Sequence, residues 1–151
     1  MAKHLVIFDS NFGNSKKLAE EISKERGKTG KATGKAINVS DFKEKELKGL
    51  DLIVMGCPII GWRPTEKINS LLQELKKKES LKGIKGASFD TRIDVFFHGD
   101  AARQITNSMK SAGAEIISEP FWFFVKGKEG PLKKGEEKRA REWAKCLREK
   151  I

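Results

Sequence analysis

The sequence has no tyrosine and only two cysteines and two histidines among its 151 residues. The cysteines, Cys57 and Cys146, lie far apart, so they predict neither a disulfide framework nor, with so few histidines, a metal cluster. No apolar run approaches the ~20 residues that a membrane-spanning helix needs. The first residues lack the apolar stretch and the small-residue cleavage site of a secretory signal. These absences exclude the disulfide-rich, metal-cluster and membrane-spanning classes, and we expect a cytoplasmic protein.

The composition is that of one folded domain, which we expect to span residues 1–151. Apolar residues make up 38% of the chain and charged residues 34%, enough for both a core and a solvated surface. Lysine and arginine number 31 against 21 aspartates and glutamates, which gives a net charge of +10. Such an excess points first to an anionic partner, of which nucleic acid is the first class to consider.

Segments with strand-like and helix-like patterns alternate along the chain. Apolar, strand-length segments predict strands at 5–8, 36–39, 50–55, 84–89 and 114–117. One-sided apolar periodicity predicts helices at about 15–26, 64–76, 100–111 and 133–148. Residues 121–125 are expected to form an edge or a pairing extension of the sheet, and residues 94–97 a short extension or an irregular loop. This alternation predicts an α/β fold, with a five-stranded parallel sheet in the order 2-1-3-4-5 and helices on both faces.

Sheets with this strand order bind ligands outside the carboxyl ends of their strands, which directs attention to loops 9–15, 56–63 and 89–94. The first of these loops joins a buried strand to a helix N-terminus. Exposed N–H groups, the helix dipole and side-chain donors favour an anion there. The loop has no lysine at the helix start, which argues against an ATP-hydrolysing P-loop. The alternative is a capped strand–helix turn without a ligand.

The residues of these loops resemble those of the flavodoxin family. Residues 8–15, FDSNFGNS, resemble the family's phosphate loop, S/T-x-x-G-N-S/T, and residues 54–65, VMGCPIIGWRPT, are similar to its GSPxxGxxP loop beside the flavin. Further matches lie at 89–92, 127–132, 135–136 and 139–140. The resemblance spans essentially the whole chain. It implies a flavodoxin-like three-layer α/β/α sandwich that binds FMN noncovalently.

The resemblance also implies which residues hold the cofactor. The expected contacts are Ser10, Asn11, Phe12, Gly13, Asn14 and Ser15 in the first loop, Pro58, Ile59, Ile60, Gly61 and Trp62 in the second, and Phe89, Asp90, Thr91 and Arg92 in the third. Trp62 is the candidate for an aromatic side chain that faces the flavin and excludes water; the alternative is that it covers the helix at 64–76. Arg92 either neutralises one end of the flavin or pairs with Asp90 or Asp94.

Two features depart from the family's pattern. Phe12 stands where many flavodoxins have threonine, although an aromatic residue is common there in the flavodoxin domains of reductases. The third loop has neither the tyrosine that commonly stacks on the flavin nor the usual glycines. These departures concern both the phosphate end and the ring end of the implied site.

Four other features bear on the function or the packing. Cys57 is either a small semi-buried residue, which we favour, or a redox-sensitive thiol. His98 is a candidate proton donor to the flavin, but no partner for it is visible in the sequence. Cys146 is expected to pack inside. The aromatic residues at 121–124 are expected to lie in the core or pair at the sheet edge, with a dimer interface as the alternative.

The leading hypothesis is an FMN-binding protein that transfers electrons between partners. The alternatives are an FMN-dependent NAD(P)H:quinone-type oxidoreductase and a binding module that has kept the fold without the cofactor. Many basic residues alternate with glutamate on predicted helix exteriors, which argues against nucleic acid. The charge instead favours an acidic redox partner, steered in at low salt. The oligomeric state is left as monomer or homodimer.

Overall fold

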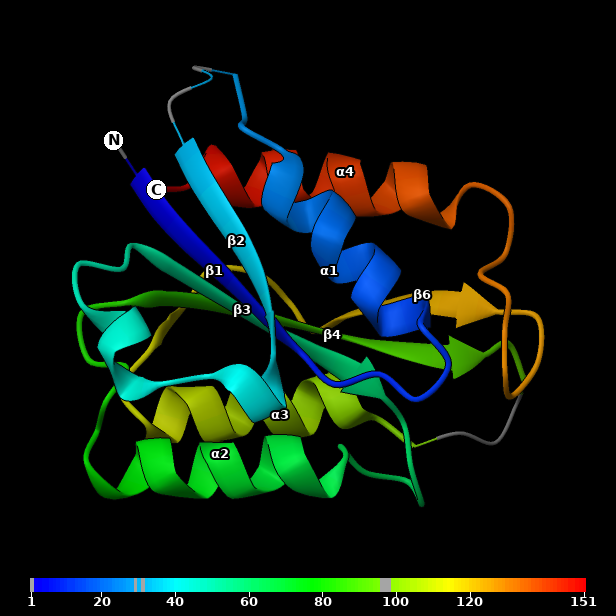
Figure 1. The fold of residues 1–151 in the computed structure, drawn as a ribbon, viewed down its shortest axis with the longest axis horizontal. Helices are drawn as coiled ribbons and strands as arrows, with labels where there is room; N and C mark the ends of the chain where they lie inside the picture. The colour runs from blue at the N-terminus through cyan, green and yellow to red at the C-terminus, as the bar shows by residue number, and fades with distance from the viewer. Residues whose placement is uncertain (1, 29, 31, 96–98) are drawn as a thin grey trace.

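The computed structural model describes residues 2–28, 30, 32–95 and 99–151, so His98 lies outside the described residues. In chain order the elements are β1 (Ala2–Phe8), α1 (Asn14–Lys24), β2 (Ala32–Asn38), the short 3-10 helices η1 (Val39–Asp41) and η2 (Glu44–Leu47), β3 (Leu52–Pro58), α2 (Glu66–Lys77), β4 (Lys85–Ile93), α3 (Ala101–Ser111), β5 (Glu115–Ile116), β6 (Phe121–Val125) and α4 (Glu136–Arg148). Helices α1 and α4 cover one face of the sheet, and α2 and α3 cover the other (Figure 1). None of the described helices is long and apolar enough to cross a membrane.

The strand order β2-β1-β3-β4-β5 confirms the predicted topology, and the paired strands all run parallel. In the described part of the chain the sheet has six strands, because two short strands share the fifth position. β5 pairs with the start of β4 at Lys85–Gly86, and β6 pairs with its end, from Phe89 to Ile93. The segment at 121–125 is therefore a pairing extension of the sheet, one of the two expected alternatives.

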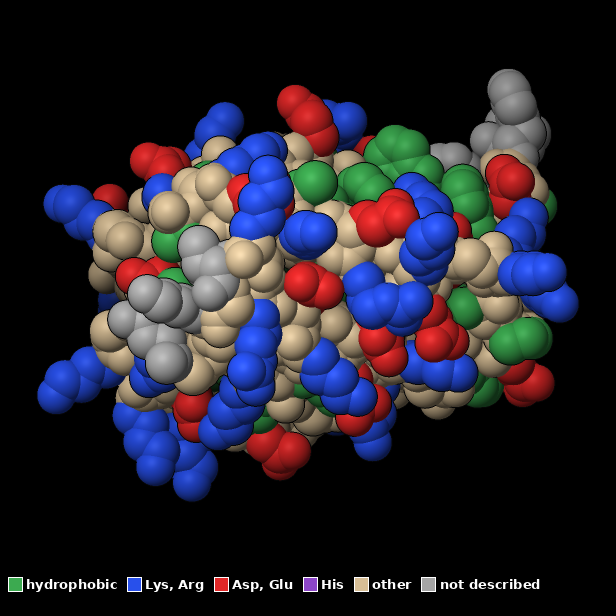
Figure 2. Space-filling model, turned by 90° about the horizontal axis from the view of Figure 1, so that it is seen from above, with side chains coloured by type: hydrophobic (Ala, Val, Ile, Leu, Met, Phe, Trp, Pro, Cys, Tyr) green, Lys and Arg blue, Asp and Glu red, His purple; other side chains and the backbone are tan. Residues whose placement is uncertain are grey.

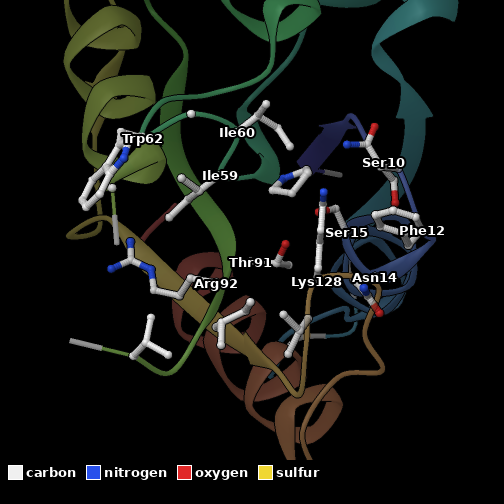
Figure 3. A pocket seen from close by; sticks show the side chains of 17 residues that line it. Ser10, Phe12, Asn14, Ser15, Ile59, Ile60, Trp62, Thr91, Arg92 and Lys128 are labelled. Carbon is white, nitrogen blue, oxygen red and sulfur yellow. The ribbon is translucent and has the colours of Figure 1, made fainter. Parts of the chain in front are cut away.

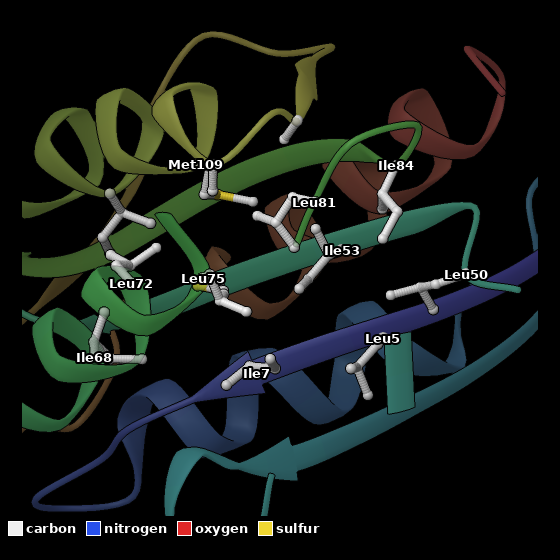
Figure 4. Packing of buried hydrophobic residues seen from close by; sticks show 14 of the residues in the cluster. Leu5, Ile7, Leu50, Ile53, Ile68, Leu72, Leu75, Leu81, Ile84 and Met109 are labelled. Carbon is white, nitrogen blue, oxygen red and sulfur yellow. The ribbon is translucent and has the colours of Figure 1, made fainter. Parts of the chain in front are cut away.

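The core consists of two clusters, one on each face of the sheet. In β1, Leu5 and Ile7 belong to the cluster under α2 and α3, whereas Val6 and Phe8 belong to the cluster under α1 and α4. Figure 4 shows the first of these clusters, in which side chains of β1 and β3 meet those of α2 and α3. A strand covered on both faces needs apolar residues at successive positions, which is why the run at 5–8 predicts it correctly.

The end of β4 differs from the prediction. Residues 89–92, expected to form a third loop, lie inside the strand, which continues to Ile93. Pairing with β6 supplies hydrogen-bond partners for this stretch, and Asp90 and Arg92 form an ion pair that allows both charges to be buried. The loop that follows β4 therefore starts at 94, five residues later than expected.

Smaller differences concern helix ends and one cysteine. α2 starts at Glu66 with Thr65 as its N-cap residue, so Pro64 precedes the helix instead of opening it. α4 starts at Glu136, three residues later than expected. Cys146 was expected to pack inside but is exposed.

Charges of opposite sign are interspersed on the face formed by α1 and α4. Figure 2 looks down on this face and shows lysine and arginine side chains mixed with aspartate and glutamate. Lys17 pairs with Glu137 and Arg141 pairs with Glu21, both across the α1–α4 contact. Exposed pairs of this kind stabilise a fold little, each by less than ~1 kcal/mol, but they leave this face without a large patch of one sign.

Both ends of the described chain lie at the amino edge of the sheet (Figure 1). Ala2 and Ile151 line a second cleft there, together with His4 and Arg148. His4 is buried in β1, and its Nδ1 accepts a hydrogen bond of 2.6 Å from Arg148 Nε. Its Nε2 has no partner among the described residues. Burial, aided by the charge of Arg148, lowers the pKa of His4 from 6.5 to about 4.

We expect the free energy of unfolding to fall as the pH drops from 6.5 towards 4, the two pKa values of His4. In this window the unfolded chain takes up a proton at His4 that the folded chain does not, which destabilises the fold by up to about 3 kcal/mol. Urea denaturation at several pH values measures the effect. His4→Asn keeps an acceptor for Arg148 but does not titrate, so its pH dependence should be shallower, and parallel curves would contradict the assignment.

Candidate functional site

A cleft of about 660 Å³ opens at the carboxyl edge of the sheet, where the loops after β1, β3 and β4 converge. Its lining residues are Ser10, Asn11, Phe12, Asn14, Ser15, Pro58, Ile59, Ile60, Gly61, Trp62, Thr91, Arg92, Ile93, Val95, Gly99, Val125 and Lys128. Figure 3 shows residues of the first loop at one end of the cleft and Trp62 at the other, with Thr91 between them and the Arg92 side chain on the side of Trp62. The volume is in the range of small-molecule and cofactor sites.

One end of the cleft is suited to an anion. The Gly13 N–H donates to Ser10 Oγ over 2.9 Å, which closes the loop just before α1 begins at Asn14. Ser15, in the first turn of α1, is 1% exposed, and its hydroxyl has no hydrogen-bond partner among the described residues. An unpartnered buried donor and the unpaired N–H groups of a helix start both attract negative charge.

A second segment completes this end. The loop between β6 and α4 folds back on itself, with the Lys126 N–H donating to the Pro131 carbonyl over 2.8 Å. Asn14 Nδ2 donates to the Glu129 carbonyl over 3.3 Å and ties this loop to the first one. Lys128 lies between these contacts, and its side chain extends into the cleft at the end where Ser15 lies (Figure 3). The charged residues in the described lining, Arg92 and Lys128, are thus both cationic.

The other end of the cleft is apolar. Trp62 lies at this end (Figure 3), and the lining of the cleft includes the exposed apolar side chains of Ile60, Trp62 and Val95, of which Trp62 is 60% exposed. Trp62 thus lines the cleft with most of its side chain exposed, as a residue expected to face the flavin would. A flat apolar ligand placed here would remove these side chains from water.

The floor of the cleft carries a buried ion pair. Arg92 Nε and Nη2 donate to the two carboxylate oxygens of Asp90 over 2.8 and 2.6 Å, and Nη2 also lies 3.3 Å from Asp100 Oδ1. Asp90 Oδ2 accepts a further bond of 2.9 Å from the Ala102 N–H, at the start of α3. The guanidinium carbon lies 4.7 Å from the ring centre of Trp122. Arg92 therefore pairs with Asp90, as one of the expected alternatives had it, while it also lines the cleft.

These contacts affect the ionisation of both partners. Burial raises the pKa of the Asp90 carboxyl, against the hydrogen bonds from Arg92 and Ala102, which favour the ionised form. Burial also acts to lower the pKa of Arg92, but the hydrogen bond and charge of Asp90 raise it overall. The guanidinium is accordingly held in its charged form beneath the cleft.

The structure brings together most of the residues expected from the sequence. All of them except Gly13, Phe89 and Asp90 line the cleft. Phe89 lies in the core, where it packs against Gly56 of β3; a Cβ at Gly56 would lie 2.1 Å from its ring. Phe89 is thus a core residue beneath the site. The lining residues that sequence reasoning missed are Ile93, Val95, Gly99, Val125 and Lys128.

Lys128 had a detectable signal, because it lies in the segment 127–132 that carries part of the family resemblance. Ile93 and Val95 depend on where β4 ends, whereas Val125 ends β6 and Gly99 lies just before α3. Cys57, next to the cleft, is fully buried, and burial raises the pKa of its thiol to about 12. A thiol that stays protonated is a poor nucleophile, which favours the interpretation of Cys57 as a small buried residue.

Known proteins match both the sequence and the fold. A family model described as Flavodoxin matches residues 6–143. A flavodoxin from Clostridium beijerinckii is 29% identical over 119 residues, which cover 76% of this chain and 81% of that protein.

Solved structures agree on the fold. An archaeal flavodoxin matches with a TM-score of 0.82 at 20% identity, over 98% of this chain and 97% of the other. Oxidised flavodoxin 1 from Bacillus cereus matches with a TM-score of 0.83 at 16% identity, over 99% of both chains. Rubredoxin oxygen:oxidoreductase from Desulfovibrio gigas matches with a TM-score of 0.78 at 14% identity, over 98% of this chain and 35% of that one. Since the family model covers most of the sequence and the fold agrees, the chain belongs to the flavodoxin family.

Proposed function

We propose that this protein binds one FMN in the cleft at the carboxyl edge of the sheet and carries electrons between partner proteins. Members of the flavodoxin family bind FMN. The observation that supports this use of the cleft best is the buried, unpartnered hydroxyl of Ser15 at the start of α1. It lies in a cleft whose described charged lining is cationic, which fits a dianionic phosphate.

The chain's own groups offer the phosphate several donors and a cation. Ser10, Asn14 and Ser15 offer side-chain donors, and the first turn of α1 adds N–H groups and the positive end of its dipole. Lys128 adds a cation from the loop that Asn14 anchors. Phe12 stands where a threonine would donate another hydrogen bond, so we assign part of the compensating charge to Lys128.

The apolar end of the cleft fits the flavin ring. Ile60, Trp62 and Val95 form walls that exclude water from a flat ligand, and Thr91 and Arg92 add polar contacts at its floor. Bound FMN supplies the redox chemistry, because it takes up and releases electrons singly or in pairs. The protein positions the ring, and its fixed charges set how readily the ring is reduced.

The rim of the cleft supports a role as an electron carrier. Most of the large hydrophobic side chains exposed on the described surface gather there: Phe12, Ile60, Trp62, Ile93 and Val95 line the cleft, whereas Trp122 and Ile151 do not. Clustered exposed apolar residues are typical of protein contact sites. A partner protein that covers this rim would come within electron-transfer distance of the flavin ring. A small, freely diffusing substrate of a reductase would not need such an apolar contact surface.

We further propose that the partner is acidic and that both proteins work in the cytoplasm. Arg63 is exposed next to Trp62 at the rim, whereas many other cations, such as Lys17 and Arg141, pair with carboxylates on the α1–α4 face. Unpaired charge near a docking site accelerates encounter with a partner of opposite sign at low salt. An exposed free thiol at Cys146 is also compatible with a reducing compartment.

Flavin content tests the proposal directly. The protein as purified, or the flavin-free protein titrated with FMN, should show flavin absorption bands and a stoichiometry of one FMN per chain. Absence of flavin with no uptake of FMN would overturn the proposal. Steady oxidation of NAD(P)H by a quinone with this protein alone would favour the reductase alternative over the carrier.

Stopped-flow kinetics test the partner. The photoreduced protein should transfer electrons faster to an acidic redox protein than to a basic one, and the acidic reaction should slow by about tenfold or more between 20 and 300 mM salt, values on the order of those set by screening. Equal rates for both partners would refute the assignment of charge.

A further inference from the structure

We propose that Gln104, acting with Gly99, is a positioning residue that holds the turn at 60–63 against α3, so that the Trp62 wall of the cleft is formed before any ligand binds. The effect on FMN rests on the proposed function, but the effect on the turn does not. Gln104 is not among the residues that line the cleft, and nothing in its sequence context marks it.

The turn has a backbone conformation that needs support. The Ile60 N–H donates to the Arg63 carbonyl over 2.8 Å, and the Arg63 N–H donates to the Ile60 carbonyl over 3.2 Å. The two central residues, Gly61 and Trp62, have φ values of 55° and 70°. Positive φ at both positions is the mark of a type I′ turn, which favours glycine, asparagine or aspartate. Tryptophan in this conformation is disfavoured by its Cβ, so other contacts must hold it there.

Gln104 supplies the first of these contacts. It is exposed in the first turns of α3, and its side-chain Nε2 donates to the Trp62 carbonyl over 3.1 Å. The bond directs the Trp62 carbonyl towards α3. It therefore restrains the backbone of the residue whose φ is unfavourable. The bond joins the turn at 60–63 to α3, two segments that lie far apart in the sequence.

Gly99 supplies the second contact. A Cβ at this position would lie 2.4 Å from the Trp62 Cα and 2.5 Å from its carbonyl carbon. The backbone of the turn therefore rests directly on the chain just before α3, at a distance that only glycine allows. Any larger residue at 99 would push the turn away from α3 and lengthen the bond from Gln104.

The helix that carries Gln104 is itself fixed to the floor of the cleft. Asp100 is the N-cap residue of α3, and its Oδ1 accepts from the Arg103 N–H over 3.1 Å. The Ala102 N–H donates to Asp90, the partner of Arg92. The wall and the floor are therefore joined through the start of α3, so their relative position does not depend on a ligand.

Because protein groups alone order the turn, no conformational entropy of the turn is lost when the cofactor binds. Loss of one hydrogen bond to a neutral group should increase opening of the turn by about 5-fold, which corresponds to about 1 kcal/mol. A ligand that binds only the closed turn loses affinity by up to the same factor. Gln104→Ala should act on the turn and on the ligand together.

Amide hydrogen exchange of the flavin-free protein tests the turn itself. In Gln104→Ala the amides of Ile60 and Arg63 should exchange about 3- to 10-fold faster than in the wild type, while amides of the β3 interior keep their rates. Gly99→Ala should have the larger effect, because it displaces the backbone. Gln73→Ala is the matched control, since Gln73 is the chain's other glutamine and is exposed on α2, away from the cleft.

Titration with FMN tests the consequence for binding. The Kd should rise by up to about 5-fold in Gln104→Ala and stay unchanged in Gln73→Ala, with equal urea midpoints for the three flavin-free proteins. Unchanged exchange at Ile60 and Arg63 in Gln104→Ala overturns the inference, whatever FMN does. If the wild type takes up no FMN, the proposed function fails, and the exchange rates alone decide the role of Gln104.

Discussion

Replacing Ser15 with aspartate should weaken FMN binding by about 100- to 1,000-fold while leaving the binding of riboflavin nearly unchanged. The Ser15 side chain is buried at the anion end of the cleft, so a carboxylate there would lie within a few ångströms of the phosphate. The carboxylate and the phosphate carry like charges, and at a short distance in a site largely shielded from water they repel each other by ~3 kcal/mol. Riboflavin has no phosphate and experiences no such repulsion.

The same substitution needs a check on the fold, because the carboxylate replaces a side chain that is 1% exposed and loses hydration there. The helix dipole offsets part of this cost, by up to ~1 kcal/mol, because the carboxylate lies in the first turn of α1. Loss of FMN affinity together with an unchanged or higher urea midpoint would therefore separate ligand repulsion from unfolding. Ser15→Ala is the control: it removes a donor without adding charge and should cost only about 3- to 10-fold in Kd. Equal losses for FMN and riboflavin would show that the phosphate does not bind at Ser15.

Removing the Asp90 carboxylate should lower the free energy of unfolding by about 3–5 kcal/mol. Asp90 is fully buried and accepts two hydrogen bonds from Arg92 and one from Ala102. In Asp90→Ala the guanidinium of Arg92 remains in a site that is 4% exposed, with Asp100 as a more distant carboxylate. A buried charge that loses its close partner keeps its desolvation cost but loses the compensating attraction.

A double-mutant cycle on the flavin-free protein measures this coupling. Asp90→Ala combined with Arg92→Met removes both charges and should recover more than half of the loss, because no unpaired charge is left behind. The destabilisation should be read from urea denaturation near neutral pH. If Asp90→Ala costs less than ~1 kcal/mol, or if the double variant is as unstable as the sum of the single ones, the pair does not stabilise the floor as described.

The sequence predicts the parts of this site that follow directly from continuous apolar strands. β1 and β3 are recognisable from the runs at 5–8 and 50–55, and the loops that follow them, including Ser15 and Trp62, lie where the topology requires. Positions after a well-defined strand end can be assigned to the carboxyl edge of the sheet with no further information. The first two loops of the site could therefore be assigned correctly to the cleft.

The third side of the site could be predicted only in part: Thr91 and Arg92 line the cleft as expected, but the end of β4 depends on contacts that are distant in sequence. Asp90 and Arg92 are charged, and charged residues are typical of exposed loops. They can lie in a buried strand because they hydrogen-bond to each other and because β4 pairs with β6. Once β4 is extended, Ile93 and Val95 move to the rim of the cleft. Local sequence propensity does not depend on pairings between distant segments, so the pattern alone predicts an end of β4 that is too early.

The positions of Ala2 and Ile151 determine which face of the protein is exposed when it is immobilised on a surface through a terminal tag. Ala2 and Ile151 lie together at the amino edge of the sheet, opposite the edge that carries the cleft (Figure 1). A tether at either terminus would leave the rim around Trp62 facing away from the support. On an electrode, such a tether would place the cofactor site on the side of the protein that faces away from the electrode surface. Direct electrochemistry therefore needs attachment through a surface residue near the rim. For capture of a soluble partner on a sensor chip, the terminal tether presents the correct face.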